Sequence, residues 1–482
     1  MKKKKFAEKK FQFRHCVFSI FLVVAACGNS SSQQKAVALQ ETKDIKHDSD
    51  LETYVVPPGI KYTESRTIDP ANPPIVIDIA NRKLNIKKFN VSDYYTNTRY
   101  VKLKHPKPAT EGNFLFDASI ITRIGDRGMT SESGFNSLFK FTDEYIIAGD
   151  SYYGIYCYDT EGNFLYTIEA NDFPKKYNAS ENSVSVNMSE VKGFSGELFI
   201  NKNLCLYKIL DDNKKRMLCI YDLSLKEQIS TKPFELSLNF VDVNSMSTIA
   251  GYFYHPLDTT RNFLFTYDIK GDTLCRFPSY NPIAERKGRN FFSLPLTDIY
   301  YYNEQLTIRQ SIHDTIFRVV SPNRIVPAYV LNFGTYKVDV RTVLTEEQPE
   351  KMRTASWKET DRFILFVYTQ GRNAPINRRN GIVKFFYSYF DKKSRQLYHL
   401  NEGTTATENE ILIENPIPNA LPFLLSQVNI DNNLLFVCFS KKRLEEIIKN
   451  KGFSSLPTEQ QNRLKTTQKE LDDNEVLIMF LE

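Results

Sequence analysis

Short apolar runs alternate with turn residues along most of the chain. Residues 150–168 show this unit most clearly, since the strand-forming run Ile155–Tyr158 is followed by the turn residues Asp159–Gly162 and by a second apolar run, Phe164–Ile168. β-branched and aromatic residues favour strands, while Asp and Gly favour the tight turn between them. The pattern therefore predicts antiparallel hairpins.

The same arrangement of an apolar strand, a Tyr-Asp pair and a turn recurs downstream. The clearest pairs are Tyr158-Asp159, Tyr221-Asp222 and Tyr267-Asp268, whose Asp residues lie 63 and 46 positions apart. Four-stranded units of roughly 40–50 residues are typical of β-propeller blades. Aromatic side chains can pack between neighbouring sheets while Asp satisfies the turn. The sequence therefore predicts an all-β propeller. A pair of β-sandwiches would also give many short strands but would not need the recurrent pair.

Helical patterns are few. Thr345–Glu359 predicts a helix interrupted at Pro349, and Lys441–Asn450 and Leu456–Leu471 predict two more. The last two precede the apolar run Val476–Leu481, so we interpret them as a small helical insertion in the last blade. A free apolar edge invites aggregation, so we expect Val476–Leu481 to pair with an N-terminal strand and close the ring.

The first residues predict export and lipid attachment. A basic start is followed by the apolar run Cys16–Ala26, which is too short to span a bilayer. Val24-Ala25-Ala26-Cys27 resembles a bacterial lipobox, in which the cysteine is diacylated; an ordinary secretory signal is the alternative. We predict a lipoprotein signal peptide at residues 1–26, a lipidated N-terminus at Cys27 with a flexible tether to residue 74, and a propeller domain at residues 75–482.

The net charge of the mature chain argues against one class of partner, and its cysteines argue against disulfide bonds. The segment 1–26 holds seven of the 63 basic and one of the 57 acidic residues, so the mature chain carries 56 of each and is formally neutral. No basic excess remains to favour nucleic acid. Five scattered cysteines predict buried thiols rather than a disulfide framework: Cys157, Cys205, Cys219, Cys275 and Cys438.

Several motifs resemble a known kind of propeller. Gly149-Asp150, Gly154-Ile155-Tyr156 and Gly162-Asn163-Phe164 resemble an NHL-type repeat, and weaker matches are Gly271–Leu274 and Asp314–Phe317. With the lipobox, the chain is similar from residue 75 to residue 481 to the six-bladed β-propeller lipoproteins of the Bacteroidota. The resemblance implies six blades and attachment to the outer membrane, and it carries over no catalytic residues. Gly28–Ser32 lacks the acidic residues typical of surface-exposed lipoproteins, which favours a periplasm-facing orientation.

Sequence motifs for catalysis are absent from the chain. There is no HExxH, CxxC, GxSxG or phosphate-binding glycine loop. We therefore predict no metal and no cofactor, assign no catalytic residues, and expect a binding or scaffolding protein with a protein or glycan partner in the envelope. The alternative is a propeller hydrolase or lyase with a metal in the central channel, held by residues from several blades.

Two weaker site predictions remain. Asp150, Tyr152 and Tyr153 lie at a predicted strand-to-loop junction, where propellers often place ligand contacts. Turn capping by the Asp and inter-blade packing of the aromatic residues are the favoured alternative. Asp258-Thr259, Asp272-Thr273 and Asp314-Thr315 resemble a sequon for O-glycosylation, and Thr259 is the candidate because it falls in a predicted loop.

Overall fold

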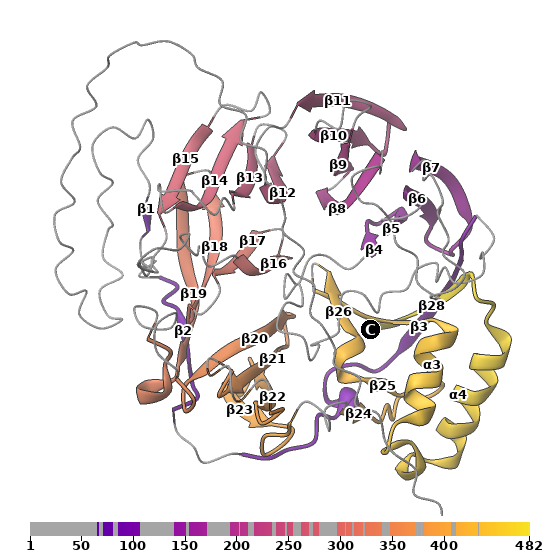
Figure 1. Cartoon of the computed structure of the whole chain (residues 1–482). Helices are drawn as coiled ribbons and strands as arrows, with labels where there is room; N and C mark the ends of the chain where they lie inside the picture. Colours follow the sequence, from indigo (N-terminus) through magenta and orange to yellow (C-terminus); the bar gives the residue numbers. More distant parts are fainter. Residues whose placement is uncertain are drawn as a thin grey trace, which may run out of the picture. The chain divides into compact units, whose positions relative to one another are not determined.

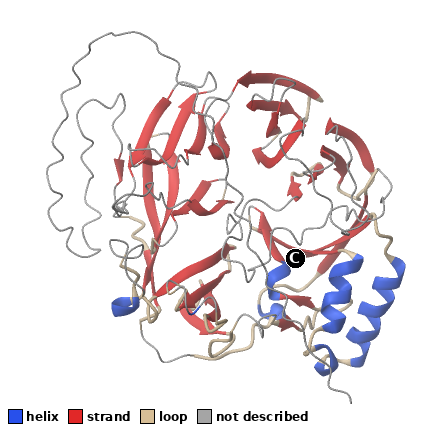
Figure 2. Cartoon of the chain, viewed as in Figure 1, coloured by secondary structure: helices blue, strands red, loops and turns tan. Residues whose placement is uncertain are grey.

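The computed structural model describes residues 65–66, 71–80, 85–106, 139–150, 154–170 and, with internal gaps, 193–339, 348–405 and 411–482. The chain divides into two units, Met1–Asp50 and Leu51–Glu482. Every described residue lies in the second unit, which consists almost entirely of antiparallel sheets (Figures 1 and 2). We number these sheets 1 to 6 in chain order.

Sheets 1 to 3 are four-stranded meanders. Sheet 1 contains β4 (Phe139–Phe141), β5 (Tyr145–Asp150), β6 (Gly154–Asp159) and β7 (Phe164–Ala170). Sheet 2 contains β8 (Gly193–Asn201), β9 (Leu204–Leu210), β10 (Arg216–Asp222) and β11 (Glu227–Pro233). Sheet 3 contains β12 (Leu238–Ser245), β13 (Thr248–Phe253), β14 (Asn262–Asp268) and β15 (Thr273–Pro278).

Sheets 4 to 6 complete the set. Sheet 4 contains β16 (Leu296–Tyr302), β17 (Gln305–Gln310), β18 (Thr315–Ser321) and β19 (Arg324–Asn332), with β1 (Ser65–Arg66) and β2 (Ile75–Asp78) added to β19. Sheet 5 contains β20 (Met352–Glu359), β21 (Phe363–Gln370), β22 (Lys384–Asp391) and β23 (Gln396–His399). Sheet 6 contains β26 (Val428–Asp431), β27 (Leu434–Phe439), β28 (Glu475–Leu481) and β3 (Thr98–Lys104).

The sheets follow one another around a centre, each in contact with the next (Figure 1). The joint between sheets 6 and 1 is a buried apolar cluster that includes Leu103, Ile478, Phe139 and Tyr156. This arrangement confirms the predicted all-β propeller. The structure has five regular four-stranded blades where six were predicted, because the remaining sheet, sheet 4, is enlarged to six strands by β1 and β2.

The predicted closure of the ring is confirmed. Residues Glu475–Leu481 of β28 pair antiparallel with residues Thr98–Lys104 of β3, so strands from the two ends of the sequence share sheet 6. The backbone of Glu482 also exchanges hydrogen bonds with that of Asn97. Both edges of β28 are therefore paired, since its other neighbour is β27.

The N-terminal segment also lines the outer edges of two other sheets. β1 and β2 both run parallel to β19 of sheet 4. On sheet 5, the backbone of His399 exchanges hydrogen bonds of 2.9 Å with Asn85 and Lys87. Ser65–Arg66 lies within the segment predicted to be a free tether, so pairing with the propeller begins before residue 75.

The recurrent Tyr-Asp turn has the predicted basis. Asp159 accepts hydrogen bonds from the backbone N–H groups of Glu161 and Asn163, and Asp222 accepts them from Ser224 and Leu225. The preceding tyrosines, at positions 158 and 221, are buried. The five cysteines predicted to be buried thiols are buried and free of disulfides.

Two of the three predicted helices are confirmed. α3 (Lys441–Lys449) and α4 (Thr458–Glu470) lie between β27 and β28, as expected of an insertion in the last blade. The helix predicted at Thr345–Glu359 is wrong, because Met352–Glu359 is strand β20 and pairs along its length with β21. Pairing with a neighbouring strand has overridden the local helical preference. None of the described helices is long and apolar enough to cross a membrane.

The smaller elements complete the outer parts of sheets 4 to 6. They are η1 (Val91–Asp93), η2 (Gly334–Tyr336), the pair β24 (Leu412–Ile413) and β25 (Phe423–Leu424), η4 (Leu425–Gln427) and η5 (Phe453–Ser455). The largest apolar cluster gathers η1, sheet 5, β24, β25, α3 and α4 with sheet 6.

Candidate functional site

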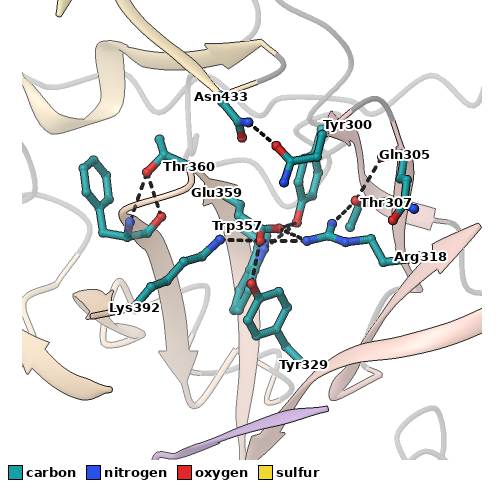
Figure 3. A network of polar contacts seen from close by, with 12 residues as sticks. Tyr300, Gln305, Thr307, Arg318, Tyr329, Trp357, Glu359, Thr360, Lys392 and Asn433 are labelled. Carbon is teal, nitrogen blue, oxygen red and sulfur yellow. Dashed lines mark hydrogen bonds and ion pairs between the residues drawn. The ribbon is translucent and has the colours of Figure 1, made fainter. Parts of the chain in front are cut away.

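A buried carboxylate, that of Glu359, lies at the centre of a polar network between two sheets (Figure 3). Its two oxygens accept hydrogen bonds from Arg318 at 2.7 Å each, and Oε1 also accepts one from Lys392 at 2.7 Å. Two tyrosine hydroxyls donate as well, Tyr300 at 2.6 Å and Tyr329 at 2.5 Å. A carboxylate has roughly four lone-pair positions, and these five hydrogen bonds leave none of them free.

The network joins sheets 4 and 5. Tyr300, Arg318 and Tyr329 come from β16, β18 and β19, whereas Glu359 ends β20 and Lys392 follows β22. In this meander β20 and β22 run in the same direction, so their C-terminal ends lie at the same end of sheet 5. Glu359 and Lys392 are therefore both at that end. The charged residues therefore meet at one end of the joint between the two sheets.

Local interactions hold Glu359 in position. The next residue, Thr360, is buried, and its hydroxyl accepts hydrogen bonds from the backbone N–H groups of Arg362 and Phe363, which shapes the turn into β21. On the other side, Nε1 of Trp357 donates to the Tyr300 hydroxyl at 2.8 Å. The single tryptophan thus touches the network through one of the tyrosines.

The electrostatics keep the carboxylate charged. Burial is the largest single influence and would raise the pKa of Glu359, but Arg318 and Lys392 together outweigh it, so this pKa lies below its ordinary value. Burial and then the Glu359 charge raise the pKa of Tyr329 and Tyr300 well above the ordinary value. At neutral pH, Glu359 is therefore an anion held by two cations and two neutral hydroxyl donors.

The two cations share an aromatic neighbour. The Tyr302 ring lies 4.4 Å from the Arg318 guanidinium and 4.1 Å from the Lys392 ammonium. Arg318 also donates to the Thr307 hydroxyl. Only 8% of the Arg318 side chain and 12% of the Lys392 side chain are exposed, against 0% for Glu359. The network therefore holds two nearly buried positive charges for one buried negative charge.

Other polar contacts link neighbouring sheets near the centre. Lys140 of β4 and Asp431 of β26 form a nearly buried ion pair at 2.9 Å, and the second Asp431 oxygen accepts a hydrogen bond from the Phe141 backbone. Lys358 of β20 donates to the Val428 carbonyl of β26. The Phe141 N–H and the Val428 carbonyl are thus each bonded to a side chain from a neighbouring sheet, as buried backbone groups require.

Two turns also meet there. Nδ2 of Asn433, in the β26–β27 turn, donates to Oδ1 of Asn303, in the β16–β17 turn, at 2.5 Å. Both residues have a positive φ, 74° and 48°, which asparagine tolerates better than most residues. Figure 3 shows Asn433 in the same view as the Glu359 network.

The geometry suits a structural clamp better than acid–base chemistry. A general base needs a free lone pair within reach of a substrate proton, whereas the Glu359 oxygens are already saturated. Among the described residues, no group of three or more His, Cys, Asp or Glu side chains is placed to hold a metal ion. The network is instead a charged joint that fixes sheet 4 against sheet 5.

Of the site residues predicted from the sequence, the structure describes one. Asp150 is the last residue of β5, and Cys27, Tyr152, Tyr153 and Thr259 lie outside the described residues.

One of the sequon-like threonines can be placed. Thr315 is buried, and its hydroxyl donates to the Asp314 carboxylate, so this threonine is closed to glycosylation in the folded chain. The sequence reasoning missed Glu359 and Arg318. One feature of the sequence could have pointed to the network: Arg318 is a charged residue within the largely apolar strand Thr315–Ser321.

The fold is an all-β propeller, and in the part of the chain that the structure describes, charged side chains link neighbouring sheets. The chain belongs to the family described as Domain of unknown function (DUF4933), whose model matches residues 57–450. A comparison with curated proteins finds no match.

Several solved structures are similar to the chain. A candidate exported protein from Bacteroides fragilis is 11% identical, with a TM-score of 0.48 over 85% of this chain and 99% of that chain. A member of the DUF4221 family from Bacteroides vulgatus is 10% identical, with a TM-score of 0.36 over 80% and 98%. The WD40 domain of Pan2 from Neurospora crassa is 10% identical, with a TM-score of 0.33 over 80% and 95%. All three TM-scores are below 0.5, so these similarities support no ligand and no activity.

Proposed function

We propose that this protein is a lipid-anchored β-propeller of the cell envelope that binds or scaffolds a partner, either a protein or a glycan. Its signal peptide would span residues 1–26, Cys27 would carry the lipid, and a tether would extend to residue 74 before the propeller. The anchor would sit in the outer membrane with the propeller facing the periplasm. The lipobox-like Val24–Cys27 supports the anchor, and the absence of acidic residues in Gly28–Ser32 supports the periplasm-facing orientation.

The saturated Glu359 network is the observation that carries the binding role. A carboxylate with five hydrogen bonds to two cations and two tyrosines contributes to rigidity and leaves no lone pair for a substrate proton. A ring closed by strands from both ends of the sequence adds to that rigidity. Rigid rings that expose loops at both ends are suited to recognition, because little conformational entropy is lost on binding.

The anchor is tested by Cys27→Ser in cells. We expect loss of labelling by a fatty-acid probe and release of the protein from the membrane fraction, with unchanged Trp357 fluorescence showing that the propeller remains folded. Unchanged labelling together with unchanged fractionation would refute lipid attachment.

The binding role is tested separately on the mature protein. Crosslinking in intact cells should recover the wild-type chain in a complex with an envelope partner, while the Cys27→Ser chain recovers less of it. A chain that crosslinks to nothing, and that as a purified protein hydrolyses esters or lactones, would overturn the binding role in favour of an enzyme.

A further inference from the structure

The Glu359 network has more positive than negative charge among the described residues. Arg318 and Lys392 face a single carboxylate, and that carboxylate already accepts as many hydrogen bonds as it can. Among the described residues, Glu359 is the one carboxylate within ion-pair distance of Arg318 or Lys392. Buried charges are usually neutralised, so a surplus cation in such a place favours an additional anion.

Lys392 is the cation with unused capacity. An ammonium has three N–H donors, and the described residues give it one hydrogen-bond acceptor, Glu359 Oε1. Its side chain is 12% exposed, whereas Glu359 is not exposed at all. Tyr302 lies against it, 4.1 Å from the ammonium to the ring centre. Lys392 can therefore offer hydrogen bonds to a small acceptor beside the Tyr302 ring.

A second polar residue labelled in Figure 3, Asn433, has an unused acceptor. Asn303 follows Tyr302 directly and binds Asn433 through its own Oδ1. The Oδ1 atom of Asn433 is buried and accepts no hydrogen bond from any described residue. A buried polar atom without a partner costs on the order of 1–3 kcal/mol, so a ligand hydroxyl that donates to it would be favoured.

From these observations we infer a ligand subsite for a small hydroxylated carboxylate, such as a sugar acid, at the end of the joint formed by the β16–β17 turn, the β26–β27 turn and Lys392. The ligand carboxylate accepts hydrogen bonds from the Lys392 ammonium. A ligand hydroxyl donates to Asn433 Oδ1. The subsite rests on the proposed binding role and gives it a ligand class.

The test uses the purified mature protein, with Cys27 replaced by Ser, and isothermal titration at constant ionic strength. The probes are D-glucuronate, acetate, D-glucose and inorganic phosphate, with chloride as the reference anion. We expect saturable binding of glucuronate, weaker binding of acetate, and none of glucose. Tighter binding of phosphate than of glucuronate, or no saturable heat with any probe, would overturn the inference.

Variants separate the two contacts. Lys392→Met should weaken glucuronate at least about 10-fold, the usual effect of losing a hydrogen bond to a charged group, while Lys392→Arg keeps most of the affinity. Lys393→Met is the matched control, since that neighbouring side chain is exposed. Asn433→Gly preserves the positive φ and should weaken glucuronate but not acetate.

Folding does not obscure these results. In Lys392→Met the Glu359 carboxylate still faces Arg318, one charge against one, so the variant should remain folded, as far-ultraviolet circular dichroism would show. Equal affinity in Lys392→Met and the wild type would refute the subsite. Because this measurement needs no membrane, anchor or cellular partner, it can fail while the proposed envelope role holds, and the reverse is equally possible.

Discussion

Replacing Glu359 by glutamine tests whether the network stabilises the propeller. The change keeps the shape of the side chain but removes its charge, and the new amide group directs donors at Arg318 and Tyr300, which are themselves donors. Arg318 and Lys392 would then be two nearly buried cations with no anion in the network.

The expected loss is large because the pair is buried. Removing one partner of a buried ion pair typically costs ~3–5 kcal/mol. With an unfolding entropy of ~2.1 cal/mol/K per residue, a unit the size of Leu51–Glu482 has ~0.9 kcal/mol/K in total. A loss of ~4 kcal/mol would lower its Tm by ~4–5 °C if the whole unit unfolds cooperatively.

Urea unfolding followed by tryptophan fluorescence is the suitable assay. Trp357 is the only tryptophan and donates a hydrogen bond to Tyr300, so its emission reports on this joint. Glu350→Gln, in the turn just before β20, is the control, since that side chain is 55% exposed and its ion pair with Lys351 is long at 3.6 Å. It should change stability by less than ~0.5 kcal/mol. If Glu359→Gln is as mild as this control, the network contributes no net stability and the reasoning fails.

Three further predictions concern the ring and its edges. Gly162→Ala should lower the free energy of unfolding by ~2–4 kcal/mol in thermal denaturation, because φ is +92° and a Cβ would lie 2.5 Å from the Lys102 carbonyl oxygen. The control Gly381→Ala, at φ +66° with nothing within 4 Å of a Cβ, should lower it by only ~1 kcal/mol. Equal losses in the two variants would exclude the clash. Burial lowers the pKa of His399 from 6.5 to about 4. Stability should therefore be full above pH ~6.5 and fall by ~2–3 kcal/mol as the pH drops towards 4, a loss that His399→Gln should abolish in acid titrations. Deleting Glu475–Glu482 should lower the Tm of the whole propeller, and an unchanged Tm would mean that β28 is dispensable.

The repeating hairpin could be predicted because its causes are local. Alternating strand-forming residues, an Asp and a tight turn lie within about twenty positions of one another, and the turn hydrogen bonds of Asp159 and Asp222 form within four residues. Ring closure could also be predicted, since the apolar run Val476–Leu481 needed a partner on both edges and the N-terminal strands were available.

Predictions that depended on distant partners failed. Thr345–Glu359 has helix-forming residues, but β21 pairs with Met352–Glu359 and buries alternate side chains, which the local composition does not reveal. The predicted count of six blades also differs from the structure, which has five regular four-stranded blades. Sheet 4 recruits Ser65–Arg66 and Ile75–Asp78 from far upstream, and no local signal at β19 announces two parallel additions.

The candidate site shows most clearly why this limit is physical. Glu359 bonds to residues that lie 59, 41, 30 and 33 positions away, on four different strands or turns. In the sequence each of these is an ordinary charged or aromatic residue, and only the joint between sheets 4 and 5 brings them together. A propeller needs its sheets held at fixed angles, and apolar packing alone is non-directional. The charged clamp supplies direction, and the anion subsite inferred above would use its second cation, Lys392.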